Sequence, residues 1–496
     1  MSAFRKVVFD LTHAIFGWAL FSFIKLKIHG KENLPTEGPF ILVSNHCSHA
    51  DAAIHFQAFK HLKGKLVTLA AEDYFFKKTS RRIMVEWIFN ALPMGRERIQ
   101  QTLLNRCSTE TSEGKAILIF PEGTRQKYPE IAAFKGALGM LAVQCQVPIV
   151  PARIFGSHRA LPKGKMRLKP YPVEAVYGLP LIPPPPTGEE QDRKSLYLKT
   201  NESIEESLKT LRRPSRGTVL ITGASSGIGA ALANEFAEAG YDLFLLGKNT
   251  TRLEEVAERC RLCFAIQCTT QSIDFSDIEK FDPWLEDFSF TLPEIDILVN
   301  NAGLGNIGPV EEADPNALDI LLKVNIRAVF RITHALLPGM KKRNCGRILN
   351  IGSVYGVVPV ENQAVYAATK AFVHSFSLSL RAELKGSGIS VTSALPGSTQ
   401  TAFHSRLNAS VKRKAGARSA EQVARDLFRA VQRGRATCTS GLHNALFLCV
   451  ARILPTSWVI AFLARFNTYR GLEGSSTANE SIGSPHQKHS SDQQTP

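Results

Sequence analysis

Short apolar runs alternate with longer amphipathic stretches from the start of the chain to about residue 440. In the first part, the apolar runs at 40–43, 116–120 and 148–151 predict buried strands with helical segments between them. A second series begins with the apolar run 218–221 and includes the run 347–351. This alternation is typical of α/β proteins, and for the second series we predict a doubly wound parallel sheet.

The two series are separated by a proline-rich stretch and a charged segment. The run Pro183–Pro186 predicts a stiff spacer, and residues 189–211 predict a charged helix that ends before Pro214. We therefore assign residues 183–214 to a linker. The predicted domains on either side of it cover residues 31–182 and 215–440.

The two ends of the chain carry apolar segments that are too short to cross a bilayer, which needs about 20 apolar residues. We interpret residues 1–30 as an amphipathic segment at a membrane interface. Residues 441–472 are apolar but interrupted by Arg452 and Pro455, which predicts two amphipathic helices that act as a lid, an interface or a membrane contact. Residues 473–496 are polar and are expected to be a disordered tail.

The chain of 496 residues is basic, with a formal charge of +16 and a pI near 9.5. This charge favours phosphates and anionic lipids as partners. Nucleic acid is not expected as a partner, since we find neither a zinc finger nor an RNA-binding signature nor a long basic run. The nine cysteines are scattered, and Cys260 and Cys263 lack a second ligand pair, so no metal site is predicted.

His46 and Asp51 form an H-x4-D pair directly after the first predicted strand. A loop that enters a helix can place Asp51 on one imidazole nitrogen, so that the other nitrogen is free to accept a proton. Transfer of an acyl group from a thioester to an alcohol requires such a base. The sequence FPEGTR at 120–125 follows another strand and offers a glycine turn, a carboxylate and Arg125, which suit a phosphorylated polyol.

These motifs resemble the glycerolphosphate acyltransferase family, which includes the lysophosphatidate acyltransferases. The resemblance covers roughly residues 10–180 and rests on four blocks in order, which read NHCSHAD, PMGR, FPEGTR and VPIVPA. It implies an α/β domain, His46 as the general base, Asp51 as its partner, and acyl-CoA or acyl carrier protein as the donor. The residues that it implies for binding the acceptor are Arg96, with Arg98 as its alternative, and Glu122, Gly123 and Arg125.

Two further histidines, His49 and His55, raise the alternative that the H-x4-D pair is part of a metal site. The four ordered blocks disfavour that reading. We therefore interpret both histidines as ordinary helix residues.

A second set of catalytic residues lies in the C-terminal half. The sequence TGASSGIG at 222–229 follows a strand and opens a helix, where glycines let the backbone approach a dinucleotide pyrophosphate. Tyr366 and Lys370 are four residues apart and share a helix face, so Lys370 is expected to lower the phenol pKa and hold the nicotinamide ribose. Tyr366 then gives a proton to a carbonyl, Ser353 binds the substrate oxygen, and Asn325 supports a proton-relay water.

This half looks like a short-chain dehydrogenase/reductase over roughly residues 215–440. The matching motifs are TGASSGIG, NNAG at 300–303, YAATK at 366–370 and the pair Pro396-Gly397. The resemblance implies a Rossmann-type sheet and a catalytic set of Asn325, Ser353, Tyr366 and Lys370. The residues that it implies for the cofactor are Gly223, Ser225, Ser226, Gly227, Ile228, Gly229, Lys248, Asp274, Asn301, Ala302, Gly303, Tyr366, Lys370, Pro396, Gly397 and Thr401.

The choice of cofactor depends on the end of the second strand of this domain. An NAD enzyme usually has an acid there, but the sequence 245–249 has none, and Asp242 lies at the wrong end. Lys248 is placed to meet a 2′-phosphate, so we favour NADP(H) over NAD(H). We expect Asp274 to contact the adenine, and residues 398–406 to form a mobile substrate loop.

A single pathway would use both chemistries: acylation of dihydroxyacetone phosphate, followed by reduction of the acylated ketone. We therefore predict a bifunctional enzyme of lipid synthesis with a phosphorylated glycerol-type substrate and a lipid ketone. It would be cytoplasmic and peripherally bound to a membrane surface. Other acceptors, an unrelated ketone, a reductase domain that only senses NADP(H), and homo-oligomer formation all stay open.

Overall fold

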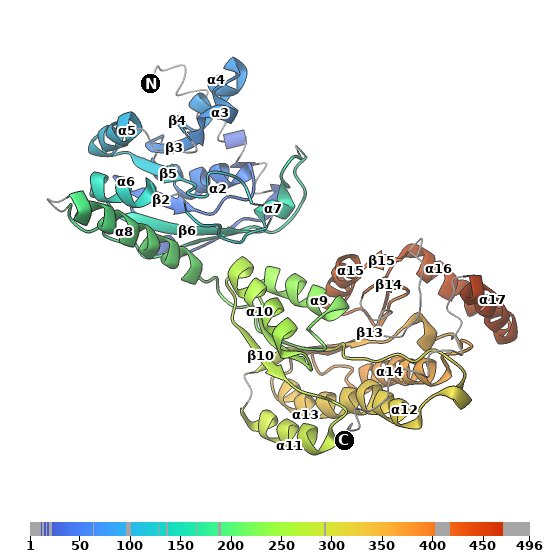
Figure 1. The fold of residues 1–496 in the computed structure, drawn as a ribbon. Helices are drawn as coiled ribbons and strands as arrows, with labels where there is room; N and C mark the ends of the chain where they lie inside the picture. The colour runs from blue at the N-terminus through green and yellow to red at the C-terminus, as the bar shows by residue number, and fades with distance from the viewer. Residues whose placement is uncertain are drawn as a thin grey trace, which may run out of the picture. The chain divides into compact units, whose positions relative to one another are not determined.

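The structure is a computed structural model that describes residues 11–469, except for 12–13, 16, 19–21, 63, 96–100, 127, 135–136, 166, 187–189, 292–293 and 402–416. The chain divides into two compact units. The first is built mainly from residues up to Arg216 and the second mainly from the residues after it. Figure 1 shows a sheet covered by helices in each of them.

The first unit contains a mostly parallel sheet with the strand order β1-β7-β6-β2-β5-β3-β4 among the described residues. Only the pairing of β6 with β7 is antiparallel in this part of the structure. The strands are β1 (Lys27–His29), β2 (Ile41–Ser44), β3 (Leu66–Ala71), β4 (Leu92–Met94), β5 (Ala116–Ile119), β6 (Ile149–Phe155) and β7 (Glu174–Tyr177). The helices are α2 (Ala50–Ala58), α3 (Glu72–Phe75), α4 (Thr79–Ile88), α5 (Gln101–Ser112), α6 (Ala137–Cys145), α7 (Ser157–Ala160) and α8 (Glu190–Thr210).

Strands β2 and β5 form the centre of this sheet, and all their residues are buried. Side chains alternate between the two faces of a strand, so a continuous apolar run is buried only when both faces are covered. On one face Leu42 and Leu118 pack with Ile54 of α2. On the other, Ile41 packs in a core that includes residues of α5, α6 and α8. The predicted α/β fold is confirmed for this unit.

Two segments lie inside the first unit although the sequence pattern placed them outside its domain. Strand β1, within the predicted interfacial segment, pairs with β7 through the register Ile28↔Ala175. Helix α8, predicted as part of a linker, buries Ile204 and Leu208 in the same core as α5 and α6. The boundaries at residues 30 and 182 therefore differ in the structure, because each segment contributes to the sheet or to its core.

The second unit is a parallel sheet with the strand order β10-β9-β8-β11-β12-β13-β16 among the described residues. This order, with the sequence running outward from β8 in both directions, confirms the predicted doubly wound Rossmann-type sheet. The strands are β8 (Thr218–Thr222), β9 (Asp242–Gly247), β10 (Cys268–Ser272), β11 (Ile295–Asn300), β12 (Gly346–Ile351), β13 (Ile389–Leu395) and β16 (Thr437–Thr439), and β14 (Thr399–Gln400) pairs with β15 (Arg418–Ser419).

Helices cover both faces of this sheet (Figure 1). Phe281 of α11, Ile332 of α13 and Leu380 of α14 pack on one face with Leu298 of β11. The helices are α9 (Gly227–Glu238), α10 (Thr250–Phe264), α11 (Ile278–Thr291), α12 (Pro315–Leu322), α13 (Ala328–Lys342), α14 (Ala364–Glu383), α15 (Ala420–Gln432), α16 (Leu442–Ala451) and α17 (Thr456–Tyr469).

Helices α16 and α17 lie on either side of Pro455, as the sequence predicts. Leu448, Val459 and Leu463 pack in a small core with Leu395, at the end of β13. The predicted tail at 473–496 lies outside the described residues.

Candidate active sites

The loop between β2 and α2 brings His46 and Asp51 together. His46 Nδ1 lies 3.0 Å from Asp51 Oδ2. The same carboxylate oxygen accepts hydrogen bonds from the backbone N–H groups of Cys47, at 2.7 Å, and Ser48, at 2.8 Å. The predicted pair is therefore formed, and an ionised Asp51 requires the imidazole proton to be on Nδ1, which leaves Nε2 as the proton acceptor.

Burial and hydrogen bonding act in opposite directions on the Asp51 carboxyl. Burial alone would raise its pKa, but the interaction with His46 and the backbone hydrogen bond from Ser48 lower the pKa below its usual value. Asp51 therefore stays ionised at neutral pH. The His46 side chain is 20% exposed, whereas that of Asp51 is 1% exposed. A buried anion thus orients a base that substrate can reach.

The FPEGTR segment lies against the same loop. Glu122 Oε1 accepts a hydrogen bond of 3.1 Å from the His46 backbone N–H, and the Gln126 N–H donates to the His46 carbonyl at 2.8 Å. Gly123 has a φ of +67°, which glycine adopts without strain, and it allows the turn to fold back. Burial raises the pKa of Glu122 to about 8.

Among the predicted acceptor-binding residues, Glu122, Gly123 and Arg125 are therefore close to His46 in the fold. The Arg125 carbonyl accepts a hydrogen bond of 2.9 Å from Lys163 Nζ, so this segment also holds a second cation. Arg96 and its alternative Arg98 lie outside the described residues.

Two residues that support His46 are not evident from the catalytic motifs. The Asn45 side chain donates to the Ile154 carbonyl at 3.0 Å and accepts from its N–H at 2.7 Å, which fixes the loop to β6. Phe120 stacks on the imidazole with ring centroids 4.2 Å apart. Asn45 directly precedes His46 in the first block and Phe120 opens the third, so both were within the motifs, but their contacts depend on the fold.

Two other histidines of this region, His55 and His49, contact tyrosine side chains of the same unit. His55 is buried and its Nδ1 lies 2.9 Å from the Tyr177 hydroxyl. Burial lowers the pKa of His55 to about 3. His49 stacks with Tyr74. Among the described residues, no group of three or more His, Cys, Asp or Glu is arranged to hold a metal ion.

The second unit contains a cavity of about 570 Å³ at the carboxyl ends of its central strands. Most of the predicted cofactor-binding residues line it. These are Gly223, Ser225, Ser226, Gly227, Ile228, Lys248, Asp274, Asn301, Ala302, Gly303, Tyr366, Lys370, Pro396, Gly397 and Thr401. Gly229 lies behind this lining, where a Cβ would be 2.4 Å from both Asn301 Nδ2 and the Gly223 carbonyl oxygen.

The glycines keep the backbone that lines this cavity compact enough for a dinucleotide to bind. Gly223 has a φ of +64°, and a Cβ there would be 2.8 Å from Ala302 Cα. Asn301 Nδ2 donates to the Thr222 and Gly223 carbonyls at 2.9 and 3.0 Å, which joins the two glycine-containing loops. The turn then enters α9, whose N-terminus attracts phosphate. The residues present therefore fit a nicotinamide dinucleotide.

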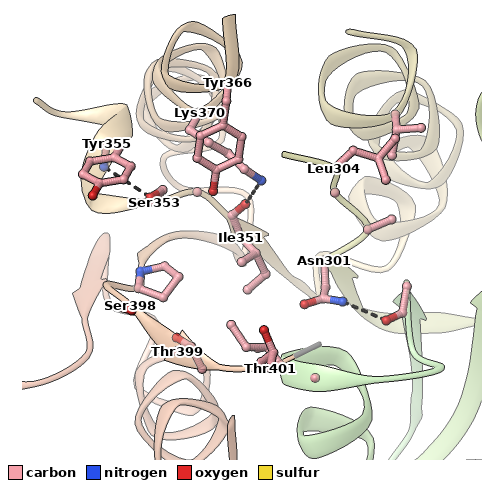
Figure 2. A pocket seen from close by; sticks show the side chains of 18 of the residues that line it. Asn301, Leu304, Ile351, Ser353, Tyr355, Tyr366, Lys370, Ser398, Thr399 and Thr401 are labelled. Carbon is pink, nitrogen blue, oxygen red and sulfur yellow. Dashed lines mark hydrogen bonds between the residues drawn. The ribbon is translucent and has the colours of Figure 1, made fainter. Parts of the chain in front are cut away.

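The predicted catalytic residues Ser353, Tyr366 and Lys370 lie together at one side of this cavity. Figure 2 shows Tyr366 and Lys370 projecting from one helix toward Ser353 and Ile351. Lys370 Nζ donates to the Ile351 carbonyl at 3.0 Å and lies 5.8 Å from the centroid of the Tyr366 ring. The four-residue spacing thus places both groups on the cavity side of α14.

The pKa of the Tyr366 phenol differs from the expectation. Burial raises it to about 12, although a hydrogen bond with Ser353 acts to lower it. Burial also lowers the pKa of Lys370 to about 8. Desolvation is the largest effect on the phenol, so its pKa is raised in this arrangement and not lowered as the sequence predicts. The phenol is protonated at neutral pH, as a proton donor must be.

The Asn325 side chain does not line the cavity but holds the backbone of a neighbouring loop in place. It is buried in a π-helical turn, Lys323–Arg327. Its side chain accepts from the Leu304 N–H at 2.8 Å, donates to the Leu304 carbonyl at 2.9 Å, and donates to Thr369 at 3.0 Å. The side chain thus fixes the end of the NNAG loop beside α14, and its support of a relay water stays a prediction.

Lys248 and Asp274 meet at the opposite end of the cavity, where Lys248 Nζ lies 2.6 Å from Asp274 Oδ2. The pKa of Asp274 is shifted down: burial acts to raise it, but the hydrogen bond from Lys248 is among the interactions that outweigh burial. Both residues line the cavity, as the sequence predicts for contacts to the adenosine part. Residues 402–406 of the predicted substrate loop lie outside the described residues, while Thr401 lines the cavity.

The C-terminal helices also line the cavity, through residues that motif reasoning missed. They are His443, Asn444 and Phe447 of α16 and Phe462 and Leu463 of α17. Asn444 packs so closely on Gly397 that a Cβ there would be 2.4 Å from its Nδ2. These helices therefore form a wall of the reductase cavity.

Comparisons with known proteins agree with this geometry. A family model described as short chain dehydrogenase matches residues 217–412, and one described as Acyltransferase matches residues 25–155. Sulfoacetaldehyde reductase 2 of Chromohalobacter salexigens is 37% identical over 187 residues, which are 37% of this chain and 73% of that protein. The chain belongs to the short-chain dehydrogenase family. Its first unit carries an acyltransferase domain, so the chain is a fusion of two enzymes.

Two other relatives of this short-chain dehydrogenase are similar in the same region. The NADP-dependent 3-hydroxy acid dehydrogenase YdfG of Salmonella typhi is 35% identical over 180 residues, which are 36% of this chain and 71% of that protein. The very-long-chain 3-oxoacyl-CoA reductase of Rattus norvegicus is 36% identical over 182 residues, which are 36% of this chain and 57% of that protein. The name of the Salmonella typhi relative gives NADP as the cofactor of that protein.

Proposed function

We propose that this enzyme acylates a phosphorylated glycerol-type acceptor and reduces a lipid ketone with NADPH. The observation that carries the proposal is that both catalytic sets are complete in one chain. His46 is oriented by Asp51, and Ser353, Tyr366 and Lys370 line one cavity. The resemblance of the first unit to glycerolphosphate acyltransferases supports the acceptor class.

In the first reaction, His46 Nε2 accepts the proton of an acceptor hydroxyl while the oxygen attacks the thioester carbonyl of acyl-CoA or acyl carrier protein. The new ester forms, the carbon–sulfur bond breaks, and the thiolate takes the proton from His46. Asp51 stabilises the imidazolium during this step. Arg125 and Lys163 lie nearby as cations for the acceptor phosphate.

In the second reaction, a bound NADPH supplies a hydride to the ketone carbon. Tyr366 donates its phenolic proton to the carbonyl oxygen, and Ser353 donates a hydrogen bond to the same oxygen. Lys370 is placed to hold the nicotinamide ribose. The preference for NADP(H) is supported by Lys248, by the lack of an acid at the end of β9, and by the NADP-dependent relative.

The two reactions are consecutive when the acceptor is dihydroxyacetone phosphate, because its acylation product is still a ketone. The relative that reduces very-long-chain 3-oxoacyl-CoA supports a ketone with a long acyl chain. Phe447, Phe462 and Leu463 supply apolar surface for such a chain.

The test uses the purified full chain with acyl-CoA, dihydroxyacetone phosphate and NADPH. We expect NADPH consumption that requires acyl-CoA, is lost in His46→Ala, and returns when pre-formed acyl-dihydroxyacetone phosphate is added. Thiol release without NADPH consumption would contradict the sequential pathway. NADPH binding without turnover of any lipid ketone would instead indicate a nucleotide-sensing domain.

A further inference from the structure

The two C-terminal helices carry a large exposed apolar surface. Leu442, Ile453 and Trp458 are 87%, 83% and 66% exposed, respectively. Exposed apolar residues that gather on two consecutive helices mark an interaction site. We call the following set the C-terminal apolar face: Leu442, Leu446, Val450, Ile453, Leu454, Trp458 and Phe462.

The helices that carry this face are anchored on their opposite side. Leu448, Val459 and Leu463 are buried in a core that also holds Val354 and Val358, from the segment after the catalytic Ser353. On α16 the exposed large aliphatic residues Leu442, Leu446 and Val450 are four positions apart, and on α17 the same spacing separates Trp458 and Phe462. Each helix therefore has one side packed on the reductase and another presented outward.

The same helices form a wall of the reductase cavity. Phe462 both lines the cavity and is 59% exposed, so the cavity meets the apolar face at this residue. A ligand that approaches across this face reaches the cavity without leaving an apolar surface.

The charges on this stretch have one sign. Arg452 and Arg465 are exposed, and residues 441–465 contain no aspartate or glutamate. Anionic lipid headgroups attract cations placed beside an apolar face, and tryptophan favours the bilayer interface. No helix of the described chain is long and apolar enough to cross a membrane. The chemistry therefore suits a surface that lies on a bilayer.

We propose that the C-terminal apolar face docks on an anionic phospholipid bilayer and admits the lipid ketone to the reductase cavity from that bilayer. The docking itself stands on the exposed residues, whereas the entry route rests on the lipid ketone of the proposed function. Docking at this place would let an acyl chain move from lipid to cavity past Phe462.

Two other occupants of the face fit less well. A second copy related by twofold symmetry would bring the same basic stretch of both copies into one interface, with no acid on the stretch to pair with Arg452 and Arg465. The chain after residue 470 is rich in polar residues, and its only large aliphatic side chains are Leu472 and Ile482. It lacks the apolar side chains needed to cover the face.

The first test measures insertion of this face directly. Tryptophan fluorescence of the full chain is recorded with vesicles of brominated phosphatidylcholine and phosphatidylglycerol, for the wild type and for Trp458→Phe. We expect quenching in the wild type, and a clear loss of that quenching in the variant. Vesicle binding in which Trp458→Phe leaves the quenching unchanged would overturn the proposal, because another part of the chain would then hold the membrane.

The second test separates docking from catalysis. The double variant Ile453→Glu/Trp458→Glu should partition into phosphatidylglycerol vesicles at least about tenfold more weakly, since acids are costly in lipid. The matched control is Leu198→Glu, at an apolar residue of α8 that is 60% exposed, and it should bind as the wild type does. Equal binding of both variants would contradict docking by this face.

The same variants test the entry route. With a soluble short-chain acyl ketone, the double variant should keep the wild-type reductase rate, because neither residue lines the cavity. With a long-chain ketone in vesicles, its rate should fall about as much as binding does. Equal rates on vesicle substrate would overturn the route.

Absence of turnover in the wild type would refute the proposed function and leave the docking result intact. A wild-type protein that sediments as a dimer, together with a double variant that sediments as a monomer, would identify a second copy as the occupant of the face.

Discussion

At the residue scale, the geometry of the acyltransferase site depends on the contacts of one carboxylate, that of Asp51. Asp51 Oδ2 contacts the imidazole and two backbone N–H groups at once, so it fixes both the loop and the orientation of His46. A neutral amide at this position would keep much of the shape. It would not stabilise the imidazolium, and its NH₂ group would favour the wrong imidazole tautomer.

We therefore expect Asp51→Asn to lower the rate of acyl transfer about 10²–10⁴-fold. Thiol release from acyl-CoA measures this rate, and the circular dichroism spectrum compared with that of the wild type serves as a check on folding. The control is His49→Asn, which changes a histidine in the same segment that stacks with Tyr74, and it should stay near the wild-type rate. An Asp51→Asn protein with nearly full transfer activity would be inconsistent with this role.

Glu122 makes stability depend on pH in a defined direction. Its pKa is raised to about 8 in the folded protein, against its ordinary value of 4.5. At a pH between these two pKa values, Glu122 has lost its proton in the unfolded chain but keeps it in the folded chain. The free energy of unfolding therefore falls as the pH rises. Relative to Glu122→Gln, the wild type should lose stability from about pH 4.5 to about pH 8 and change little above it. Chemical denaturation of both proteins across this range measures the difference, and a difference that does not vary with pH would contradict the shift.

In the proposed mechanism Tyr366 is the proton donor of the reductase, and its hydroxyl is all that Tyr366→Phe removes. We expect kcat for ketone reduction to fall about 10²–10⁴-fold. NADPH binding, followed by nicotinamide fluorescence, should change little, because the glycine loops and Lys370 are untouched. Loss of NADPH binding in this variant would show that the phenol acts on the cofactor site instead.

The spacing of chemical groups made these residues predictable from the sequence. An H-x4-D pair after a strand and a four-residue Tyr–Lys spacing on a helix both place side chains by local geometry. The roles of Asn45 and Phe120 depend instead on β6 and on the turn after β5, which local spacing does not contain. The Tyr366 pKa was mispredicted for a related reason, since burial depends on the whole cavity.

At the element scale, helix α8 shows how composition can mislead. Its many charged residues suggested a linker, yet Ile204 and Leu208, four positions apart, form one apolar stripe that packs beside Leu138 of α6. Gly139 lies where a Cβ would be 1.9 Å from the Tyr197 carbonyl oxygen, so the two helices approach closely. Two apolar residues at helical spacing were the available signal, and the surrounding charges obscured it.

Leu208→Ala tests whether α8 is part of the core. Leu208 is fully buried, so the substitution should lower the unfolding free energy of the first unit by about 2–5 kcal/mol. Leu198→Ala, at an exposed position of the same helix, should change it by less than about 0.5 kcal/mol. Urea denaturation monitored by loss of acyl transfer compares them, and equal effects of both changes would support the linker prediction.

The helices α16 and α17 were predicted as elements, but their place on the cavity was not. No motif joins Phe447 to Ser353, because the two are almost a hundred residues apart in sequence and come together only in the folded cavity that both line. Only tertiary packing shows that these helices form a wall of the reductase cavity.

At the scale of the whole molecule, the two sites use separate residues and separate cores. His46→Ala should therefore leave the reduction of a pre-formed ketone unchanged, and Tyr366→Phe should leave thiol release unchanged. An equimolar mixture of the two variants should complete both reactions more slowly than the wild type at the same concentration, because the intermediate must move between molecules. NADPH consumption after mixing measures this, and equal rates at low protein concentration would show that the fusion gives no kinetic advantage.

The position of α8 also bears on how such a fusion arises and how it can be divided. A gene break at residue 182, where the proline run begins, would remove Ile204 and Leu208 and leave Leu138 and Leu141 facing water. A break near residue 216 would keep every helix of the first core and would start the other product at β8. The recombination that joined the two genes is thus expected to lie between α8 and β8. A free-standing acyltransferase ancestor would already have ended in this helix.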